Sequence, residues 1–295
     1  MSTRLALSTD IFDSNGVNSA SARASESTLS AVLEAAAASG VADIDTQPGD
    51  GDVERTLGCC WPFPSPFQVT IKTLSLEGQS VERVEARARR SLDLMGLARG
   101  YAVLVQHPAD LLGRDGHALW TRLQALKAEG VVQKVGVVMT MEDAPVHLAR
   151  RFRPDLIQIN GSILDQRPDR SGVLHAFEDL GCELWLRSVF LNGLLFMPRE
   201  DLPPALADAG PRLSRIRRML AEAGADPMQA ALAYARSRPE VSAAVIDVRS
   251  AAELKALAAA ASQPQPSLDW PQFALDDPTA LDPQRWARVT GRAAA

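Results

Sequence analysis

The chain has 295 residues, a length that suits one or two domains and allows a large buried core. Its apolar fraction of 46% and charged fraction of 23% are typical of a globular protein. A formal net charge of −5 and a pI near 5.5 argue against nucleic acid or an anionic membrane as the main partner.

The apolar runs and the cysteines bear on location. No run approaches about 18 uninterrupted apolar residues, so we expect no transmembrane helix. The first residues lack the long apolar core of a signal peptide. The three cysteines, Cys59, Cys60 and Cys182, are too few and too irregularly spaced for a disulfide framework or a zinc site. We therefore expect a cytoplasmic protein with reduced thiols and no bound metal.

Short apolar runs alternate with helical patterns along the chain, which is typical of βαβ units. The expected strands are Leu5–Leu7, Ala42–Asp45, Gln68–Lys72, Ala102–Gln106, Lys134–Val138, Leu156–Ile159, Glu183–Arg187 and Ala243–Ile246. The expected helices begin near Ser25, Asp52, Ser80, Gly116, Glu142, Arg170, Pro227 and Ser250. Eight strand–helix repeats favour a closed (β/α)8 TIM barrel of the α/β class. An open doubly wound sheet is the alternative, but no Gly-x-Gly-x-x-Gly follows the first strand.

Two further segments extend this pattern. We expect an extra helix at roughly residues 206–223, between strand seven and the seventh helix. The tail is rich in Pro, Asp and Trp, and Trp270 and Trp286 should pack it against the barrel, because an irregular segment needs apolar anchors. We interpret the chain as a single domain, with a barrel over residues 1–262 and a packed C-terminal tail over residues 263–295.

Three reactive side chains fall at successive strand ends. Asp45 ends the second expected strand, Lys72 ends the third, and His107 follows the fourth. Chemistry in a (β/α)8 barrel gathers at the carboxyl ends of the strands, so these side chains are candidate site residues. A structural interpretation stays open: a buried Asp45–Lys72 ion pair, and a histidine that is hydrogen-bonded at the barrel rim.

The run from Val41 to Glu54 resembles the signature of the aldo/keto reductase family, in which Asp-Thr is followed by Tyr-Gly and then by Glu. Asp45, Thr46, Gly51 and Glu54 fit that signature. The resemblance covers about residues 4–262. It implies an NAD(P)H-dependent oxidoreductase of carbonyl or sugar-like substrates, in which the cofactor supplies hydride and the protein supplies placement and a proton.

In this family a tyrosine donates the proton, a lysine lowers the pKa of that tyrosine, an aspartate pairs with the lysine, and a histidine orients the carbonyl. Lys72, Asp45 and His107 match the last three roles, but Asp50 stands at the position of the tyrosine. A model aspartate has a pKa of about 3.9 and a model tyrosine about 10. Beside Lys72 the Asp50 carboxylate would be driven further toward ionisation, so we expect it to hold no proton at neutral pH.

The resemblance also implies a cofactor site. The sixth strand carries Gln158, which matches the residue that holds the nicotinamide amide. The matches to the pyrophosphate loop and to the adenosine end are Arg187, Ser188, Phe190, Asn192, Gly193, Arg249, Ser250 and Glu253. A helix N-terminus with a nearby arginine binds anions well. The alternative is that Arg249 is a solvated loop charge and Ser250 only a helix cap.

Other positions depart from the family pattern. Val138 replaces a serine that helps hold the nicotinamide, and Asp247 stands where a glycine lets the cofactor phosphate approach. The resemblance implies NADP as the cofactor, and these departures indicate that its site is weakened. The loop after the sixth strand, with Asp165-Gln-Arg167, and the segment that starts at Arg187 resemble a bacterial branch of the family.

Two hypotheses for function follow. The first is an oxidoreductase with impaired turnover, in which Lys72, His107 or an ordered water polarises or protonates the substrate oxygen. The second is an inactive pseudoenzyme that binds a nucleotide, a metabolite or a protein. A basic run on the extra helix, Arg212 to Arg218, is interpreted as a solvated face.

Overall fold

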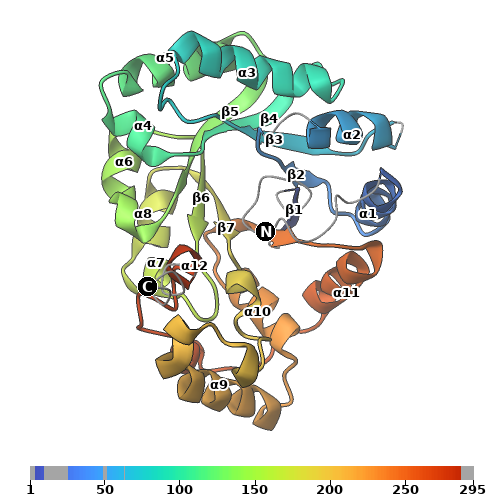
Figure 1. Ribbon diagram of the computed structural model, residues 1–295, viewed down its shortest axis with the longest axis vertical. Helices are drawn as coiled ribbons and strands as arrows, with labels where there is room; N and C mark the ends of the chain where they lie inside the picture. Colours follow the sequence, from blue (N-terminus) through green and yellow to red (C-terminus); the bar gives the residue numbers. More distant parts are fainter. Residues whose placement is uncertain (1–3, 10–25, 49–51, 63, 287–295) are drawn as a thin grey trace, which may run out of the picture.

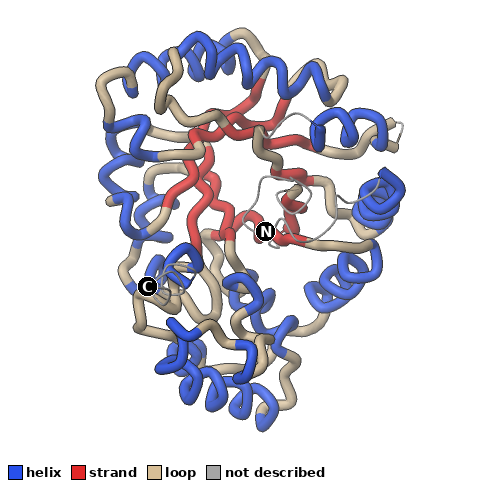
Figure 2. The backbone as a smooth tube through the Cα atoms, in the orientation of Figure 1, coloured by secondary structure: helices blue, strands red, loops and turns tan. Residues whose placement is uncertain are grey.

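The computed structural model describes residues 4–9, 26–48, 52–62 and 64–286. Eight parallel strands close into a barrel in chain order, and the helices surround it (Figures 1 and 2). The strands are β1 Arg4–Ser8, β2 Asp43–Asp45, β3 Gln68–Lys72, β4 Gly100–Val105, β5 Val132–Met139, β6 Leu156–Asn160, β7 Glu183–Arg187 and β8 Val241–Asp247. The predicted (β/α)8 TIM barrel is confirmed.

The α-helices among the described residues are α1 Glu26–Ala38, α2 Asp52–Cys60, α3 Val81–Leu94, α4 Pro108–Leu112, α5 Gly116–Ala128, α6 Pro145–Phe152, α7 Arg167–Arg170, α8 Val173–Asp179, α9 Gly210–Glu222, α10 Pro227–Arg236, α11 Ala251–Ser262 and α12 Pro283–Trp286. In this part of the chain, no helix is both long and apolar enough to cross a membrane.

Local capping accounts for the helices that differ from expectation. The helix expected near Glu142 is a 3-10 turn, Met141–Asp143, in which Thr140 and Asp143 cap each other. Ala144 then adopts a left-handed φ of 50°, so α6 begins only at Pro145. The helix expected near Arg170 is likewise two short helices, α7 and α8, which a left-handed glycine separates. The five-residue α4 was not predicted.

The barrel interior is filled by alternate residues of the strands. A compact apolar cluster inside the barrel contains Ala6, Ala102, Leu104, Val138, Leu156, Trp185, Ala243 and Val245. The intervening strand residues, such as Leu7, Ile44 and Ile71, belong to the larger cluster that the helices cover. Gly136 is required here, because an added Cβ would lie 2.0 Å from the Leu156 carbonyl oxygen. The barrel centre is therefore packed and separates two polar ends.

The C-terminal segment lies against the loop that follows β6. The backbone N–H of Leu275 donates to the Leu164 carbonyl at 2.8 Å, and the side-chain amide of Gln166 donates to the Trp270 carbonyl at 2.6 Å. The Trp270 ring meets the ring of Tyr234 on α10 edge-on, with centroids 5.7 Å apart. These contacts hold the described part of the tail against the loop that follows β6. The division of the chain at residue 262 stays a prediction.

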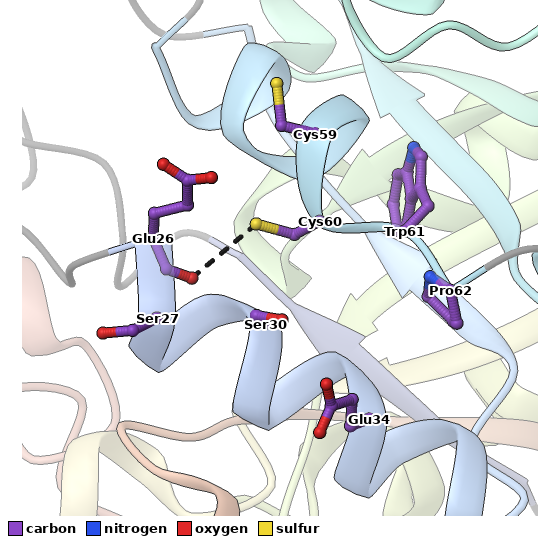
Figure 3. Close-up of a pocket in the computed structure, with 8 residues that line it drawn as sticks. All are labelled: Glu26, Ser27, Ser30, Glu34, Cys59, Cys60, Trp61 and Pro62. Atoms are coloured by element: carbon purple, nitrogen blue, oxygen red, sulfur yellow. Dashed lines mark hydrogen bonds between the residues drawn. The ribbon is translucent and has the colours of Figure 1, made fainter.

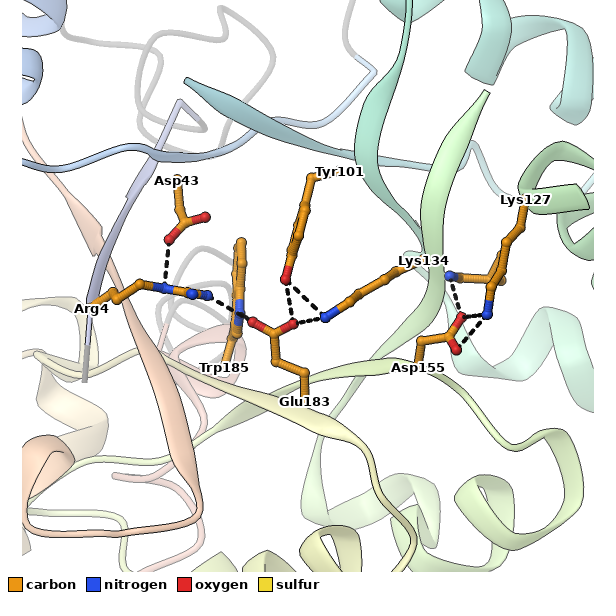
Figure 4. A network of polar contacts seen from close by, with 9 residues as sticks. Arg4, Asp43, Tyr101, Lys127, Lys134, Asp155, Glu183 and Trp185 are labelled. Carbon is orange, nitrogen blue, oxygen red and sulfur yellow. Dashed lines mark hydrogen bonds and ion pairs between the residues drawn. The ribbon is translucent and has the colours of Figure 1, made fainter. Parts of the chain in front are cut away.

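A polar network fills the opposite end of the barrel, where the strands begin (Figure 4). The Glu183 carboxylate accepts hydrogen bonds from Arg4 at 2.8 Å, from the Tyr101 hydroxyl at 2.5 Å, from Trp185 at 2.8 Å and from Lys134. Burial alone would raise the pKa of Glu183, but the hydrogen bonds from Lys134, Tyr101 and Trp185 outweigh it and hold that pKa below its usual range. The ionised form of Glu183 therefore stabilises the fold.

This network predicts an acid-dependent loss of stability. A lowered folded-state pKa contributes stability above the unfolded pKa of about 4.3, and this stability is lost as the pH falls through the folded value. We expect Glu183→Gln to lower the free energy of unfolding by about 2 kcal/mol at pH 7, and the difference from wild type should shrink toward pH 3. Urea denaturation at both pH values measures this. Glu178→Gln, on the exposed side of α8, is the control. A difference that does not change with pH would contradict the prediction.

Candidate active site

Three side chains meet inside the carboxyl end of the barrel. Asp45 is the last residue of β2, Lys72 is the last residue of β3, and Gln158 lies on β6. One Asp45 carboxylate oxygen accepts from Lys72 Nζ at 2.8 Å, and the other accepts from Gln158 Nε2 at 2.9 Å. All three residues are at most 1% exposed. The sequence placed these residues at the site, and the structure adds that one carboxylate holds the other two in place.

The second polar atom of Gln158 has a different environment. Its side-chain oxygen is buried and has no hydrogen-bond partner among the described residues. A buried acceptor without a partner costs about 1–3 kcal/mol. An amide N–H of a bound molecule would satisfy this oxygen, so the residues present fit the carboxamide of a nicotinamide.

The remaining residues of the Asp-Thr signature have structural partners. The Thr9 hydroxyl donates to the Thr46 hydroxyl at 2.8 Å, and this bond is buried between the ends of β1 and β2. Glu54 on α2 pairs with Arg87 on α3 at 2.6 Å and is 1% exposed. The sequence analysis missed Arg87. The available signal was its place near Val84 and Ala88, on the buried face of α3.

His107 lies at the rim of the barrel. It follows the end of β4 and precedes α4, and its carbonyl accepts from the Asp110 N–H at 2.9 Å. Leu104 pairs with Lys72 in the sheet, which puts His107 three residues beyond the level of Lys72. The residue is exposed, whereas Asp45 and Lys72 are buried. A substrate bound above the strand ends would therefore have the His107 imidazole on its solvent-facing side and Asp45 and Lys72 beneath it.

Asp50 lies outside the described residues, so its geometry stays a prediction. The chain contains only two tyrosines, and both lie away from the carboxyl ends of the strands. The expected fourth strand began at Ala102, so Tyr101 should have preceded it. In the structure Tyr101 lies within β4, because Gly100 already pairs with Val132. Burial, together with its hydrogen bond to Glu183, raises the pKa of Tyr101.

The second tyrosine is no better suited to proton donation. Tyr234 lies in α10 and is 2% exposed. Burial raises its pKa strongly. A catalytic phenol requires a lowered pKa, so neither tyrosine has the environment of a general acid at this site.

The loop after β7 is a run of tight, partly left-handed backbone turns. Phe190 is right-handed, whereas Leu191, Asn192 and Gly193 have φ values of 45°, 50° and 77°. The N–H groups of Leu191, Gly193 and Leu194 already donate to the carbonyls of Ser188, Phe190 and Leu191, at 2.8–3.0 Å, so the loop folds back on itself through its own backbone hydrogen bonds. Ser188 also has a left-handed φ of 57°, and its hydroxyl donates to Asn160 at 3.3 Å.

The residues that follow β8 make a helix cap. The Ser250 hydroxyl accepts from the Glu253 N–H at 3.2 Å, and the Glu253 carboxylate accepts from the Arg249 N–H at 2.7 Å. Ser250 therefore caps α11, as one of the two interpretations held. Arg249 is exposed at the start of this helix, and Asp247 is an exposed residue at the end of β8. The Glu253 carboxylate thus occupies the N-terminus of α11, and the exposed Arg249 side chain lies beside it.

Two other features lie away from the strand ends. A cavity of about 640 Å³ between α1 and α2 is lined by Glu26, Ser27, Ser30, Glu34, Cys59, Cys60, Trp61 and Pro62 (Figure 3). The Cys60 thiol there donates to the Glu26 carbonyl at 3.6 Å. On the outside of the barrel, single ligand atoms of His175, Glu178 and Glu240 lie within 4.8 Å of one another. Nothing in the sequence indicated that these three side chains would lie close together.

The sequence and the fold agree on one family. The chain belongs to the aldo/keto reductase family, whose profile matches residues 14–274. The aldo-keto reductase AKR11C1 from Bacillus halodurans, in its holo form, has a similar structure, with a TM-score of 0.70 and 17% identity over 92% of this chain and 91% of that one. PA4992 from Pseudomonas aeruginosa, assigned as an aldo-keto reductase, gives a TM-score of 0.64 and 20% identity over 89% and 90% of the two chains. Comparison with curated proteins gave no match.

The buried network at the strand ends predicts that removing one of its two charges destabilises the fold more than removing both. Lys72→Met leaves the Asp45 carboxylate buried without its cation, so we expect a loss of about 3–5 kcal/mol in the free energy of unfolding. The double variant Asp45→Asn/Lys72→Met should lose less than Lys72→Met alone, because no unpaired charge remains. Chemical denaturation at pH 7 measures both.

The control for this prediction is Lys127→Met. Lys127 pairs with Asp155 at 2.6 Å, but the two side chains are 38% and 29% exposed. Solvent screens such a pair, so we expect a loss of about 1 kcal/mol or less. A double variant Asp45→Asn/Lys72→Met that is no more stable than Lys72→Met would contradict the coupling of Asp45 and Lys72.

Proposed function

We propose that this chain is an NADP-dependent aldo/keto reductase of carbonyl or sugar-like substrates in which proton delivery is weakened. Family membership supports the oxidoreductase class. The observation that carries the proposal is the buried Asp45–Lys72–Gln158 network at the carboxyl ends of the strands, with one unpartnered oxygen on Gln158. The same observation, in a chain whose two tyrosines lie elsewhere, supports a site that has kept its binding groups and lost its phenol.

Specific groups would hold the cofactor. The Gln158 oxygen would accept from the carboxamide of the nicotinamide. By resemblance to the family, the loop that runs from Arg187 through Gly193 would take the pyrophosphate, and the exposed Arg249 side chain would face the adenosine end. The cofactor supplies hydride when it is bound, and these side chains bind and orient it. Asp247 opposes close approach of phosphate, which supports weak binding.

Proton delivery is the weak step of the proposed reaction. Reduction of a carbonyl leaves an oxygen that must gain a proton, and an ionised Asp50 would have none to give. Lys72, His107 or an ordered water would have to polarise or protonate that oxygen instead. Loss of a positioned general acid costs on the order of 10² to 10⁴ in rate. Slow turnover is therefore the expected behaviour.

A second candidate function is a pseudoenzyme. The position of both tyrosines away from the strand ends favours it, because a site without a phenol can still bind a nucleotide or a metabolite. This candidate shares the binding network with the first and differs only in turnover. The free cysteines support a cytoplasmic location for either.

One comparison of variants tests the proposal. We expect wild type to bind NADPH in a fluorescence titration and to reduce aldehydes slowly. Asp50→Tyr should raise kcat/KM by about 10²-fold or more, because it restores a phenol at the position that the family uses. Asp50→Phe is the matched control, since it adds the ring without the hydroxyl.

The outcomes separate the candidates. Binding of NADPH with a gain only in Asp50→Tyr supports the reductase. Binding without a gain in either variant supports the pseudoenzyme. Failure to bind NADPH at millimolar concentration excludes the proposed function, and high wild-type turnover contradicts the role assigned to Asp50.

A further inference from the structure

Arg217 on α9 points its guanidinium at the loop that follows β7. Its Nε donates to the Leu195 carbonyl at 2.9 Å, and its Nη2 donates to the carbonyls of Leu194, at 3.3 Å, and Met197. One side chain therefore satisfies three carbonyls of a single loop. Burial lowers the pKa of Arg217, which shows that the guanidinium has been taken partly out of water to make these bonds.

The loop that Arg217 holds is costly to form. Ser188, Leu191 and Asn192 are non-glycine residues with left-handed φ values between 45° and 57°. Such residues persist only where surrounding contacts impose the conformation. The five donors of a planar guanidinium are suited to this task, because they are fixed relative to one another, whereas a lysine offers a single mobile centre. Arg217 contacts the far end of the loop, where it fixes Leu194 to Met197.

The helix that carries Arg217 is itself anchored. Leu213, Ile216 and Leu220 make the buried face of α9. On the same helix, Arg212 donates to the carbonyls of Gln272, at 2.6 Å, and Ala274, at 3.3 Å. The expectation of a solvated basic face is thus wrong for Arg212 and Arg217, and it holds for the exposed Arg215 and Arg218.

We propose that Arg217 is a positioning residue for nucleotide binding. It holds the loop from Ser188 to Met197, which the proposed function assigns to the pyrophosphate, in its tightly turned conformation, and it acts through the loop without touching the cofactor. This inference rests on the proposed function, because it needs a nucleotide at that loop. It also assigns a purpose to α9, which an eight-stranded barrel does not need in order to close.

The test compares Arg217→Met, Arg217→Lys and, as matched control, the exposed neighbour Arg218→Met. We expect Arg217→Met to weaken NADPH binding about tenfold or more, because binding would then have to order the loop that Arg217 no longer holds. Arg217→Lys should recover part of that loss, and Arg218→Met should equal wild type. The emission maximum of bound NADPH should stay unchanged, because Gln158 at the nicotinamide end is not altered.

A second measurement does not depend on nucleotide. Hydrogen–deuterium exchange of residues 188–197 in the ligand-free protein should be faster in Arg217→Met and unchanged in Arg218→Met. Circular dichroism confirms that each variant is folded, and Arg217→Lys carries the comparison if Arg217→Met is not. Unchanged exchange in a folded Arg217 variant overturns the inference.

The two proposals fail in different ways. If wild type and Arg217→Met bind NADPH equally well, the positioning role is wrong and the proposed function stands. If wild type does not bind NADPH, the proposed function fails and the positioning role fails with it, even where exchange of the loop is faster.

Discussion

The Asp45 carboxylate, buried between Lys72 and Gln158, is the interaction on which the mouth of the barrel depends. A buried carboxylate is tolerated only when donors satisfy it, and these two donors come from β3 and β6. β2 and β6 are not neighbours in the sheet, so Gln158 reaches Asp45 only because the barrel is closed. The packed interior around Trp185 and Leu156 supports this closure. It also separates the charged groups at the carboxyl ends of the strands from those where the strands begin.

The polar network at the end of the barrel where the strands begin shows that the right residue types alone do not make a catalytic site. Tyr101, Lys134 and a carboxylate from Glu183 meet there, which are the kinds of groups that the family uses for catalysis at the other end. The phenol donates directly to the carboxylate, and burial and this bond raise its pKa rather than lower it. The neutral phenol is thus stabilised, which is the reverse of activation. These groups therefore stabilise the barrel.

Sequence reasoning succeeded where the signal is local and periodic. Apolar runs located all eight strands, residue types at strand ends placed Asp45 and Lys72 at the barrel mouth, and the resemblance to the family pointed to Gln158. It failed where the outcome depends on distant partners. Gln158 and Asp45 are 113 residues apart, so no local pattern reveals their hydrogen bond. Arg217 resembled a solvated charge, because its partners are backbone carbonyls on another segment, and backbone carbonyls have no signature in a sequence. The short α4 and the divided helices depended on single capping residues.

Energetics argue that the polar mouth serves a ligand. Replacing a buried ion pair by apolar residues of similar volume is often neutral or stabilising, so a barrel that needed only to fold has little use for Asp45 and Lys72. A network kept for structure alone would also be complete, as that of Glu183 is, with every carboxylate oxygen bonded. The network at the mouth lacks one donor, at the Gln158 oxygen. A bound molecule with an amide would supply it, and the loss of a catalytic phenol would not affect that bond. Under the proposed function, binding and turnover would therefore be separable in this chain, because the group that recognises the nucleotide is not the group that delivers the proton.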